Sequence, residues 1–169
     1  SQLLRPDRKF DTVVSLVGPW ASNYTHWFQD YLTRLEGLEH YRSETGVDPA
    51  VLIPSEASGW MRDALRAVGY GSDQWIEWDG GRARAGQLIV SSVRREARER
   101  APNRRIVYSP TGVQWVRDRI RSGIDAERTV PHSERIYLSR SNALTRQVRN
   151  EDEVMALLTD WGFERYHPE

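Results

Sequence analysis

The sequence predicts an α/β fold, in which helices and strands alternate along the chain and pack in layers. Two observations lead to this prediction. Short apolar runs typical of buried strands alternate with segments whose apolar residues recur every three or four positions, as on one face of a helix. The chain also has 169 residues, of which 38% are hydrophobic, which is enough to bury a sizeable core and allows one domain or one domain and a fraction.

The first part of the chain alternates strand, helix, strand and helix. Gly18 and Pro19 close the first strand, and Ser22 or Asn23 provides the side-chain oxygen that caps the first helix. Gly69 ends the second helix. The predicted ranges are 12–17 for the first strand, 27–38 for the apolar stripe of the first helix, 51–53 for a buried strand and 59–68 for the second helix.

In the middle of the chain, the sequence predicts three more strands and one helix. Residues 79–81 (DGG) form a turn after the first of these strands. Ser109-Pro110 opens the helix, because proline at a helix start costs no hydrogen bond. A polar segment rich in turn-forming residues then indicates a linker. The predicted strands cover 75–78, 87–90 and 105–108, the helix runs from 112 to about 121, and the linker covers 122–133.

The last part of the chain predicts one helix flanked by strands at 135–139 and 163–166. Asn150 caps this helix, Glu153 at the third helical position completes a pattern like a capping box, and Gly162 ends the helix. A strand–helix–strand unit is a building block of an α/β domain rather than a finished domain. We therefore expect the second domain to be incomplete.

The composition excludes several classes of protein. The chain has no cysteine, so it has no disulfide scaffold, thiolate metal centre or cysteine nucleophile. Its 24 Lys and Arg residues balance 24 Asp and Glu residues, so no overall charge attracts nucleic acid. No apolar run approaches the ~20 residues of a membrane-spanning helix, and the N-terminus lacks the apolar segment of a signal peptide. We expect a soluble, cytoplasmic protein with no nucleic-acid partner, for which peripheral association with a membrane stays open.

The segment 23–27 (NYTHW) lies between a predicted strand and the first turn of a helix. Open α/β sheets bind their ligands at this edge. His26 is therefore a candidate base, or a donor to a phosphate or sugar hydroxyl, and Asp30 lies four residues later on the same helix face, where it can orient the imidazole. The alternative is a structural histidine packed among aromatic side chains, namely Tyr24, Trp27 and Phe28.

The segment 139–150 joins a predicted strand to the last helix. Arg140 and Arg146 in this loop, together with a helix N-terminus, favour binding of a diphosphate, because guanidinium groups and helix N-termini both attract phosphate oxygens. The loop has no glycine, so it is neither a P-loop nor a dinucleotide fingerprint. The alternative is a solvated loop whose structural role is the cap of Asn150.

Two other sets of residues carry less specific signals. The segment 94–105 has six arginines against Glu96 and Glu99, and the interleaved glutamates predict a solvated helical face rather than a nucleic-acid patch. We expect no protein-bound metal, because no metal-ligand spacing occurs among the remaining histidines, which are His40, His132 and His167.

Two stretches of the sequence resemble glycosyltransferase family 61, a family also described as capsular polysaccharide biosynthesis proteins or as a domain of unknown function (DUF563). The first stretch, NYTHWFQDYLTRLEGLEHY, is similar to the family pattern N-Y-x-H-W, an acidic residue and L-x-R-L. The second, RIYLSRSNALTRQVRNEDEVMALLTDWGFE, is similar to a strand followed by S-R-x-x-A-x-x-R and N-E-x-E-V. The matching positions are Asn23, Tyr24, His26, Trp27, Leu32, Arg34 and Leu35, then Ser139, Arg140, Ala143, Arg146, Asn150, Glu151, Glu153 and Val154.

The resemblance implies a fold and a reaction. The fold is GT-B, with two Rossmann-like, three-layer domains that face each other across a cleft. The reaction is transfer of a sugar from a nucleotide-sugar to an acceptor hydroxyl with inversion, in the synthesis of a polysaccharide or another glycoconjugate. The nucleotide-sugar is a co-substrate, and no metal or other cofactor is implied.

The resemblance also implies roles for individual residues. His26 becomes the best candidate for the base, and Asp30, where the family more often has Glu, is a second one. The acceptor is expected beside Asn23, Tyr24 and Trp27. The nucleotide diphosphate is expected at Arg140 and Arg146, which clamp it, with Asn150 and Glu151 shaping the loop beneath.

The matched stretches imply two domains of unequal completeness. Residues 1–131 correspond to the acceptor-side domain and a linker, and residues 132–169 correspond to the first strand and helix of a donor-binding domain. The family pattern continues with H-G-A-x-L-x-N, which this sequence does not contain, so we expect weak or absent transferase activity from this chain by itself. A second hypothesis is a non-catalytic α/β module that binds a protein or glycan through the 94–105 segment or exposed tryptophans.

Overall fold

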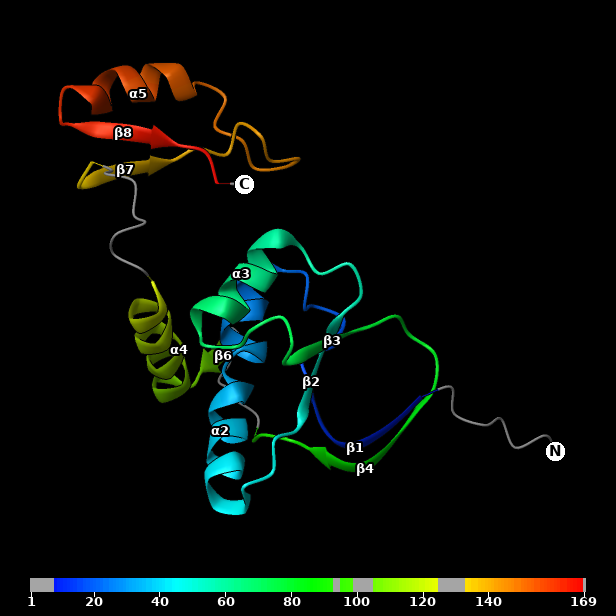
Figure 1. Ribbon diagram of the computed structural model, residues 1–169. Helices are drawn as coiled ribbons and strands as arrows, with labels where there is room; N and C mark the ends of the chain where they lie inside the picture. The colour runs from blue at the N-terminus through cyan, green and yellow to red at the C-terminus, as the bar shows by residue number, and fades with distance from the viewer. Residues whose placement is uncertain (1–7, 93–94, 99–104, 125–132, 169) are drawn as a thin grey trace. The chain divides into compact units, whose positions relative to one another are not determined.

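The computed structural model describes residues 8–92, 95–98, 105–124 and 133–168 (Figure 1). The chain divides into two compact units. Unit 1 comprises Ser1–Ile124 and unit 2 comprises Asp125–Glu169. The division falls within the polar segment 122–133 that the sequence indicates as a linker, of which residues 125–132 lie outside the described residues.

Unit 1 contains a parallel four-stranded sheet with the strand order β3-β2-β1-β4. Its strands are β1 (Arg8–Ser15), β2 (Ala50–Pro54), β3 (Trp75–Trp78) and β4 (Ala83–Ile89). Val14 of β1 is in register with Val51 of β2 on one side and with Ile89 of β4 on the other. The chain therefore leaves β1 towards β2 and later returns to the opposite side of β1, which makes the β1–β4 pair a topological switch point. All four strands occur close to their predicted places, although β1 and β4 begin earlier.

The helices of unit 1 are α1 (Tyr24–His26), the π-helix η1 (Trp27–Tyr31), α2 (Arg34–Thr45), α3 (Gly59–Ala67) and α4 (Pro110–Gly123). The sequence predicts one continuous helix where α1, η1 and α2 follow one another. Two predicted caps are confirmed: Asn23 Oδ1 accepts a hydrogen bond from the backbone N–H of His26, and Ser109 Oγ accepts one from that of Gly112. The helix after Ser109 begins at Pro110, two residues before the predicted start.

One hydrophobic cluster joins the sheet of unit 1 to its helices. The strands contribute Val14, Val51 and Ile53, Leu16 follows β1 directly, and η1, α2, α3 and α4 contribute side chains that include Trp27, Leu35, Leu38, Met61, Leu65 and Val116. Helices α2 and α3 lie beside the sheet, and α4 packs against α3, η1 and α2 (Figure 1). This parallel sheet is compatible with the Rossmann-like expectation.

The arginine-rich segment differs from its prediction. Arg95–Arg98 is strand β5, which pairs with β6 (Arg105–Tyr108) in an antiparallel hairpin, with Glu96 opposite Val107. The helical face predicted for 94–105 is therefore wrong over β5, and residues 94 and 99–104 lie outside the described residues. Arginine, glutamate and alanine all favour a helix, so the strand conformation of this segment comes from its pairing with β6.

Unit 2 is a parallel β–α–β unit, as the sequence predicts. Strand β7 (Arg135–Leu138) pairs with β8 (Phe163–Tyr166), and α5 (Glu151–Thr159) connects them. Asn150 occupies the position before α5, but its side chain makes no capping bond to the helix backbone, and its Nδ2 donates instead to Glu153 Oε2 at 3.3 Å. The predicted capping box is thus replaced by a contact between the two side chains.

Candidate functional site

A cavity of about 420 Å³ lies at the carboxyl ends of β1 and β4. This is the switch point of the sheet, where α/β proteins commonly bind ligands. Its walls come from the end of β1, from the end of β4 and the residues that follow it, and from the chain around η1. The lining residues are Val14, Ser15, Val17, Trp20, Asp30, Tyr31, Arg34 and residues 88–92.

His26 and Asp30 form a hydrogen-bonded pair beside this cavity. His26 Nδ1 lies 2.6 Å from Asp30 Oδ2, and the two side chains are 23% and 11% exposed. Asp30 lines the cavity, and the imidazole ring of His26 lies 5.9 Å from the indole of Trp20, another lining residue. The structure therefore brings together the two residues that the sequence singled out, in an arrangement that can fix the orientation and tautomer of the imidazole.

The π-helical turn sets the position of this pair. The N–H of Leu32 bonds the carbonyl of Trp27, five residues earlier, and the α-helical ladder resumes only at α2. Side chains then satisfy the carbonyls at the break, since Thr33 Oγ1 donates to Gln29 O and Arg34 Nε donates to Asp30 O, each at 3.0 Å. Single π turns inside α-helices frequently mark functional sites.

Arg34 connects this helix break to the sheet. Its Nη1 donates to the carbonyl of Ser15 at the end of β1, at 2.9 Å, and its guanidinium lies over the ring of Tyr31, at 4.6 Å from the ring centroid. On the other wall, Ser91 Oγ donates to the carbonyl of Arg34 at 2.7 Å. Arg34 and Ser91 were not among the predicted site residues. The L-x-R-L match at Arg34 was the available sequence signal for the first, whereas nothing in the sequence pointed to Ser91.

The predicted acceptor-side residues take different positions. Asn23 caps α1, and Tyr24 is exposed with its ring against Phe28 at 4.7 Å and Trp60 at 5.2 Å. Trp27 is 0% exposed within the core, so its ring is closed to an acceptor, and this part of the prediction is corrected. A tryptophan at this helix position belongs to the apolar stripe that packs on the sheet.

Trp20 is the exposed aromatic residue that the sequence analysis missed. Its side chain is 58% exposed and lines the cavity. It follows Gly18-Pro19 directly, in a loop that leaves a strand end. That position was the available signal, because an apolar side chain in such a loop has no strand or helix face into which it can pack.

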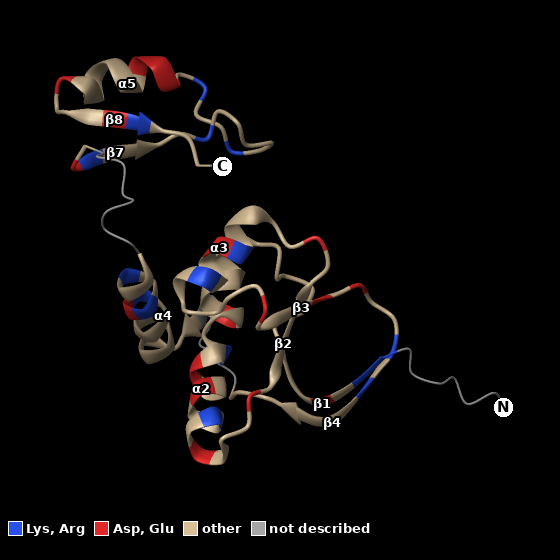
Figure 2. Ribbon diagram, in the orientation of Figure 1, with Lys and Arg blue, Asp and Glu red and all other residues tan. Residues whose placement is uncertain are grey.

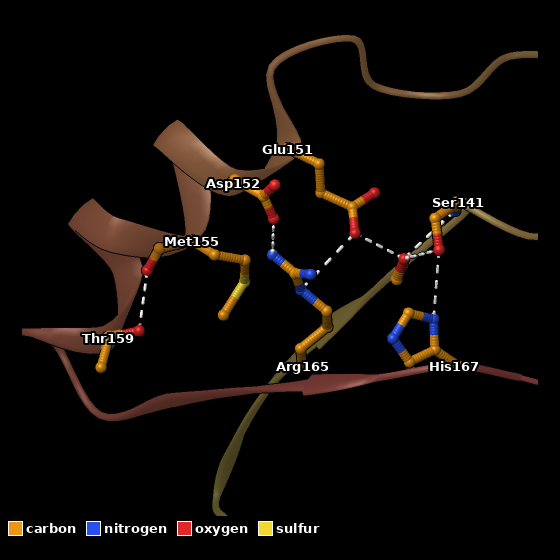
Figure 3. Close-up of polar contacts among 8 residues, drawn as sticks. Ser141, Glu151, Asp152, Met155, Thr159, Arg165 and His167 are labelled. Atoms are coloured by element: carbon orange, nitrogen blue, oxygen red, sulfur yellow. Dashed lines mark hydrogen bonds and ion pairs between the residues drawn. The ribbon is translucent and has the colours of Figure 1, made fainter.

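In unit 2, the loop between β7 and α5 is fixed to the helix by a buried contact. Ser139 Oγ donates to Glu151 Oε1 at 2.5 Å, and both residues are buried. Arg165 of β8 points towards the same carboxylate, with its Nε 3.6 Å from Glu151 Oε1, and its Nη2 donates to Asp152 Oδ1 at 2.7 Å (Figure 3). This last hydrogen bond raises the pKa of the Arg165 guanidinium. Glu151 therefore anchors the loop beneath the predicted clamp residues.

Arg140 and Arg146 lie in this loop and are both exposed. Arg140 Nη2 donates to the carbonyl of Thr145 at 3.3 Å, so its side chain spans the loop, and Arg146 has a left-handed backbone with φ of 59°. The first turn of α5 carries Glu151, Asp152 and Glu153 (Figure 2). Three carboxylates occupy the positive end of the helix dipole, so they oppose anion binding at this helix N-terminus, and the positive charge in the loop comes from the arginines.

Two features are absent from the part of the chain that the structure describes. No group of three or more His, Asp or Glu side chains there is arranged to hold a metal ion. None of the described helices combines the length and the apolar character that crossing a bilayer requires.

A comparison with protein families identifies the chain. The family described as Glycosyltransferase 61 matches residues 24–169, which is most of the chain and includes both the His26–Asp30 pair and unit 2. The chain therefore belongs to glycosyltransferase family 61, and the resemblance of the two sequence stretches is confirmed. Comparisons with curated proteins and with solved structures give no significant match.

Proposed function

We propose that this chain forms part of an inverting glycosyltransferase that moves a sugar from a nucleotide-sugar to an acceptor hydroxyl, in the synthesis of a polysaccharide or another glycoconjugate. The observation that carries the proposal is the His26–Asp30 pair at the edge of the switch-point cavity, in a chain of glycosyltransferase family 61. Unit 1 is assigned to the acceptor and unit 2 to the donor.

The acceptor loses its proton to His26 in this proposal. Nδ1–H of His26 donates to Asp30 Oδ2, which leaves the lone pair of Nε2 to take the proton of the acceptor hydroxyl. The acceptor oxygen then bonds to the anomeric carbon as the bond from that carbon to the diphosphate oxygen breaks. Attack from the face opposite the leaving group inverts the anomeric configuration, and Asp30 stabilises the imidazolium that forms.

The acceptor ring packs against Trp20. This indole is exposed at the cavity wall, close to the His26 ring, and a flat aromatic face offers a large apolar area to the carbon-bound hydrogens of a sugar. Arg34, which also lines the cavity, supplies hydrogen-bond donors to acceptor hydroxyls in this proposal. Trp20 therefore replaces Trp27 as the proposed aromatic residue beside the acceptor.

The departing nucleoside diphosphate is assigned to the loop of unit 2. Arg140 and Arg146 offset its charge electrostatically, while Glu151 holds the loop through Ser139. Asn150 contacts Glu153 and thereby shapes the junction between the loop and α5. The proposed reaction does not require a metal ion.

The test compares two variants of His26, Asn and Gln, whose side chains differ in length by one methylene group. His26→Asn keeps a donor near the Nδ1 position but lacks Nε2, whereas His26→Gln keeps a polar atom near Nε2. The full chain is incubated with a panel of nucleotide-sugars and saccharide acceptors, and release of nucleoside diphosphate is measured. General-base catalysis is worth about 10²–10⁴ in rate, so His26→Asn lowers kcat by about that factor with the donor KM unchanged.

Donor binding is measured separately, so that low turnover does not hide the result. Uridine diphosphate is titrated into the full chain, and amide shifts in the loop 139–150 are followed by NMR. Arg140→Ala and Arg146→Ala weaken this binding. Unchanged turnover in His26→Asn would overturn the base assignment, and the absence of any shift near Arg140 with uridine, adenosine and guanosine diphosphates would overturn the donor assignment.

A further inference from the structure

Three aromatic side chains form a cluster at the carboxyl edge of the sheet in unit 1, separate from the residues that line the cavity. Tyr24 begins the helix that follows β1, and Trp60 lies in the first turn of α3, which follows β2. The centroid of the Tyr24 ring lies 5.2 Å from that of Trp60 and 4.7 Å from that of Phe28. The rings of Phe28 and Trp60 stack at 6.4 Å. We call these three residues the Tyr24 cluster, and the proposed reaction so far does not use them.

Tyr24 is the exposed member of this cluster. It is 65% exposed although it contacts two other rings, so packing leaves most of its surface open. Those contacts hold the ring in one orientation, and a ligand that binds an already ordered side chain loses less entropy. The start of α3, next to Trp60, is also open, because Ser58 is exposed and makes no capping hydrogen bond and a Cβ on Gly59 would meet no atom within 4 Å. An open aromatic face thus lies beside a serine hydroxyl and the first backbone N–H groups of a helix.

The Tyr24 cluster and the His26–Asp30 pair lie on opposite flanks of the same helical segment. Positions 24 and 26 are about 200° apart on a helix with 3.6 residues per turn. Tyr24 accordingly contacts Phe28, four residues later, on one flank. His26 contacts Asp30, also four residues later, on the flank that faces the cavity. A helix with its side chains is about 10–12 Å across, which is more than one sugar ring spans, so a carbohydrate that reaches both flanks has more than one ring.

We propose that the Tyr24 cluster is a second carbohydrate subsite, which binds a sugar of the acceptor chain other than the one that reacts. This inference rests on the acceptor half of the proposed function. The sugar with the reactive hydroxyl lies at His26 and Trp20, and a sugar further along the chain packs on Tyr24. The carbon-bound hydrogens of that sugar face the aromatic ring, and its hydroxyls bond to Ser58 and to the first N–H groups of α3.

The size of the Tyr24 cluster favours a sugar over a protein partner. An aromatic side chain presents about 150–250 Å² of surface, and two of the three rings, those of Phe28 and Trp60, are partly buried against the core. A standard protein–protein interface takes about 800 Å² from each partner. One exposed ring and two partly buried ones provide much less than this area, but enough for the face of one sugar ring.

The experiment measures how affinity depends on the length of the acceptor. The full chain is titrated with cello-, manno-, xylo- and chito-oligosaccharides of one to four units, and binding is followed by amide shifts in NMR spectra. Within a series that binds, the single sugar shifts residues near Trp20 and Ser91, and the longer chains also shift Tyr24 and residues 58–60. The longer chains bind about threefold to tenfold more tightly, which is the value of one aromatic contact.

Four variants separate the two subsites. Tyr24→Ala removes the gain in affinity with length and leaves binding of the single sugar unchanged, whereas Tyr24→Phe keeps the ring and retains the gain. Trp20→Ala weakens binding of all lengths alike. Trp161→Ala is the matched control, because it removes an exposed tryptophan of unit 2, and it changes neither quantity.

The outcomes distinguish this inference from the proposed function. Affinity that does not rise with length, or a rise that Tyr24→Ala leaves in place, would refute the second subsite and leave the first intact. Unchanged turnover in His26→Asn, with the length dependence present, would remove the base and support the subsite. If no series shifts residues near Trp20 or Tyr24, the acceptor assignment and this inference fall together.

Discussion

Replacing Gly37 by Ala tests the contact that closes one wall of the cavity. Gly37 lies inside α2, and a Cβ at this position would be 2.6 Å from Ser91 Oγ and 3.1 Å from Ser91 Cβ. Ser91 follows β4, lines the cavity and donates its hydroxyl to the carbonyl of Arg34. The glycine therefore allows the chain after β4 to approach α2 closely, and alanine forces Ser91 to move.

Three terms set the magnitude of the effect. Alanine is more favourable than glycine within a helix by about 1 kcal/mol. Rotation of Ser91 Oγ away from the new methyl group loses its hydrogen bond, which costs about 1 kcal/mol. The Ser91 Cβ is still too close, and overpacking of this kind costs about 1–3 kcal/mol. We therefore expect Gly37→Ala to lower the free energy of unfolding of unit 1 by about 1–3 kcal/mol.

The assay is urea unfolding of the full chain followed by near-UV circular dichroism, with two controls. Gly59→Ala places a methyl group at the start of α3, where nothing lies within 4 Å, and we expect no loss of stability. In a Ser91→Gly background the obstacle is gone, and Gly37→Ala becomes stabilising by about 1 kcal/mol. A Gly37→Ala variant that is more stable than wild type would refute the close contact, as would equal effects of Gly37→Ala in the two backgrounds.

Two further predictions concern single aromatic residues. Burial raises the pKa of Tyr70 to about 12, and its hydroxyl has no hydrogen-bond partner among the described residues. The unfolded phenol ionises near pH 10, so the stability that the un-ionised phenol provides is complete below pH 10, and on the order of 3 kcal/mol is lost as the pH rises through about 12. Tyr70→Phe removes this loss at little or no cost at pH 7. Equal alkaline destabilisation of both proteins in urea titrations would contradict this prediction. Trp27→Ala costs about 3–5 kcal/mol because the ring is fully buried, whereas Trp20→Ala changes stability by less than about 0.5 kcal/mol and raises the acceptor KM in the turnover assay. A Trp20→Ala variant with an unchanged acceptor KM would remove Trp20 from the acceptor site.

Local signals in the sequence predicted local structure well. Asn23 and Ser109 cap their helices, and Gly162 takes the left-handed conformation, with φ of 77°, where the last helix ends. Each of these features depends on a side chain and backbone groups within a few residues of it, so the sequence carries the whole interaction. The i, i+4 spacing of His26 and Asp30 belongs to the same class, and their hydrogen bond is present.

Features that depend on distant residues were predicted less well. Trp27 lies both in the predicted apolar stripe of the first helix and on the predicted acceptor side, and the packing of η1 on the sheet makes it a core residue, whereas Trp20, which was not predicted, is exposed. The strand β5 was missed because its conformation comes from pairing with β6 and not from its own charge pattern.

The sequence by itself determined the family, the alternation of strands and helices, and the residues that form the His26–Asp30 pair and the Arg140–Arg146 loop. These are properties of short stretches and of residue types. The tertiary structure alone decided that β4 pairs with β1, so that the cavity forms at the switch point, and that Ser91 meets Arg34 across 57 positions of the chain. It also decided that Glu151, two serines and His167 form one polar chain. Such contacts follow from strand order and close packing, which no local pattern of side chains specifies.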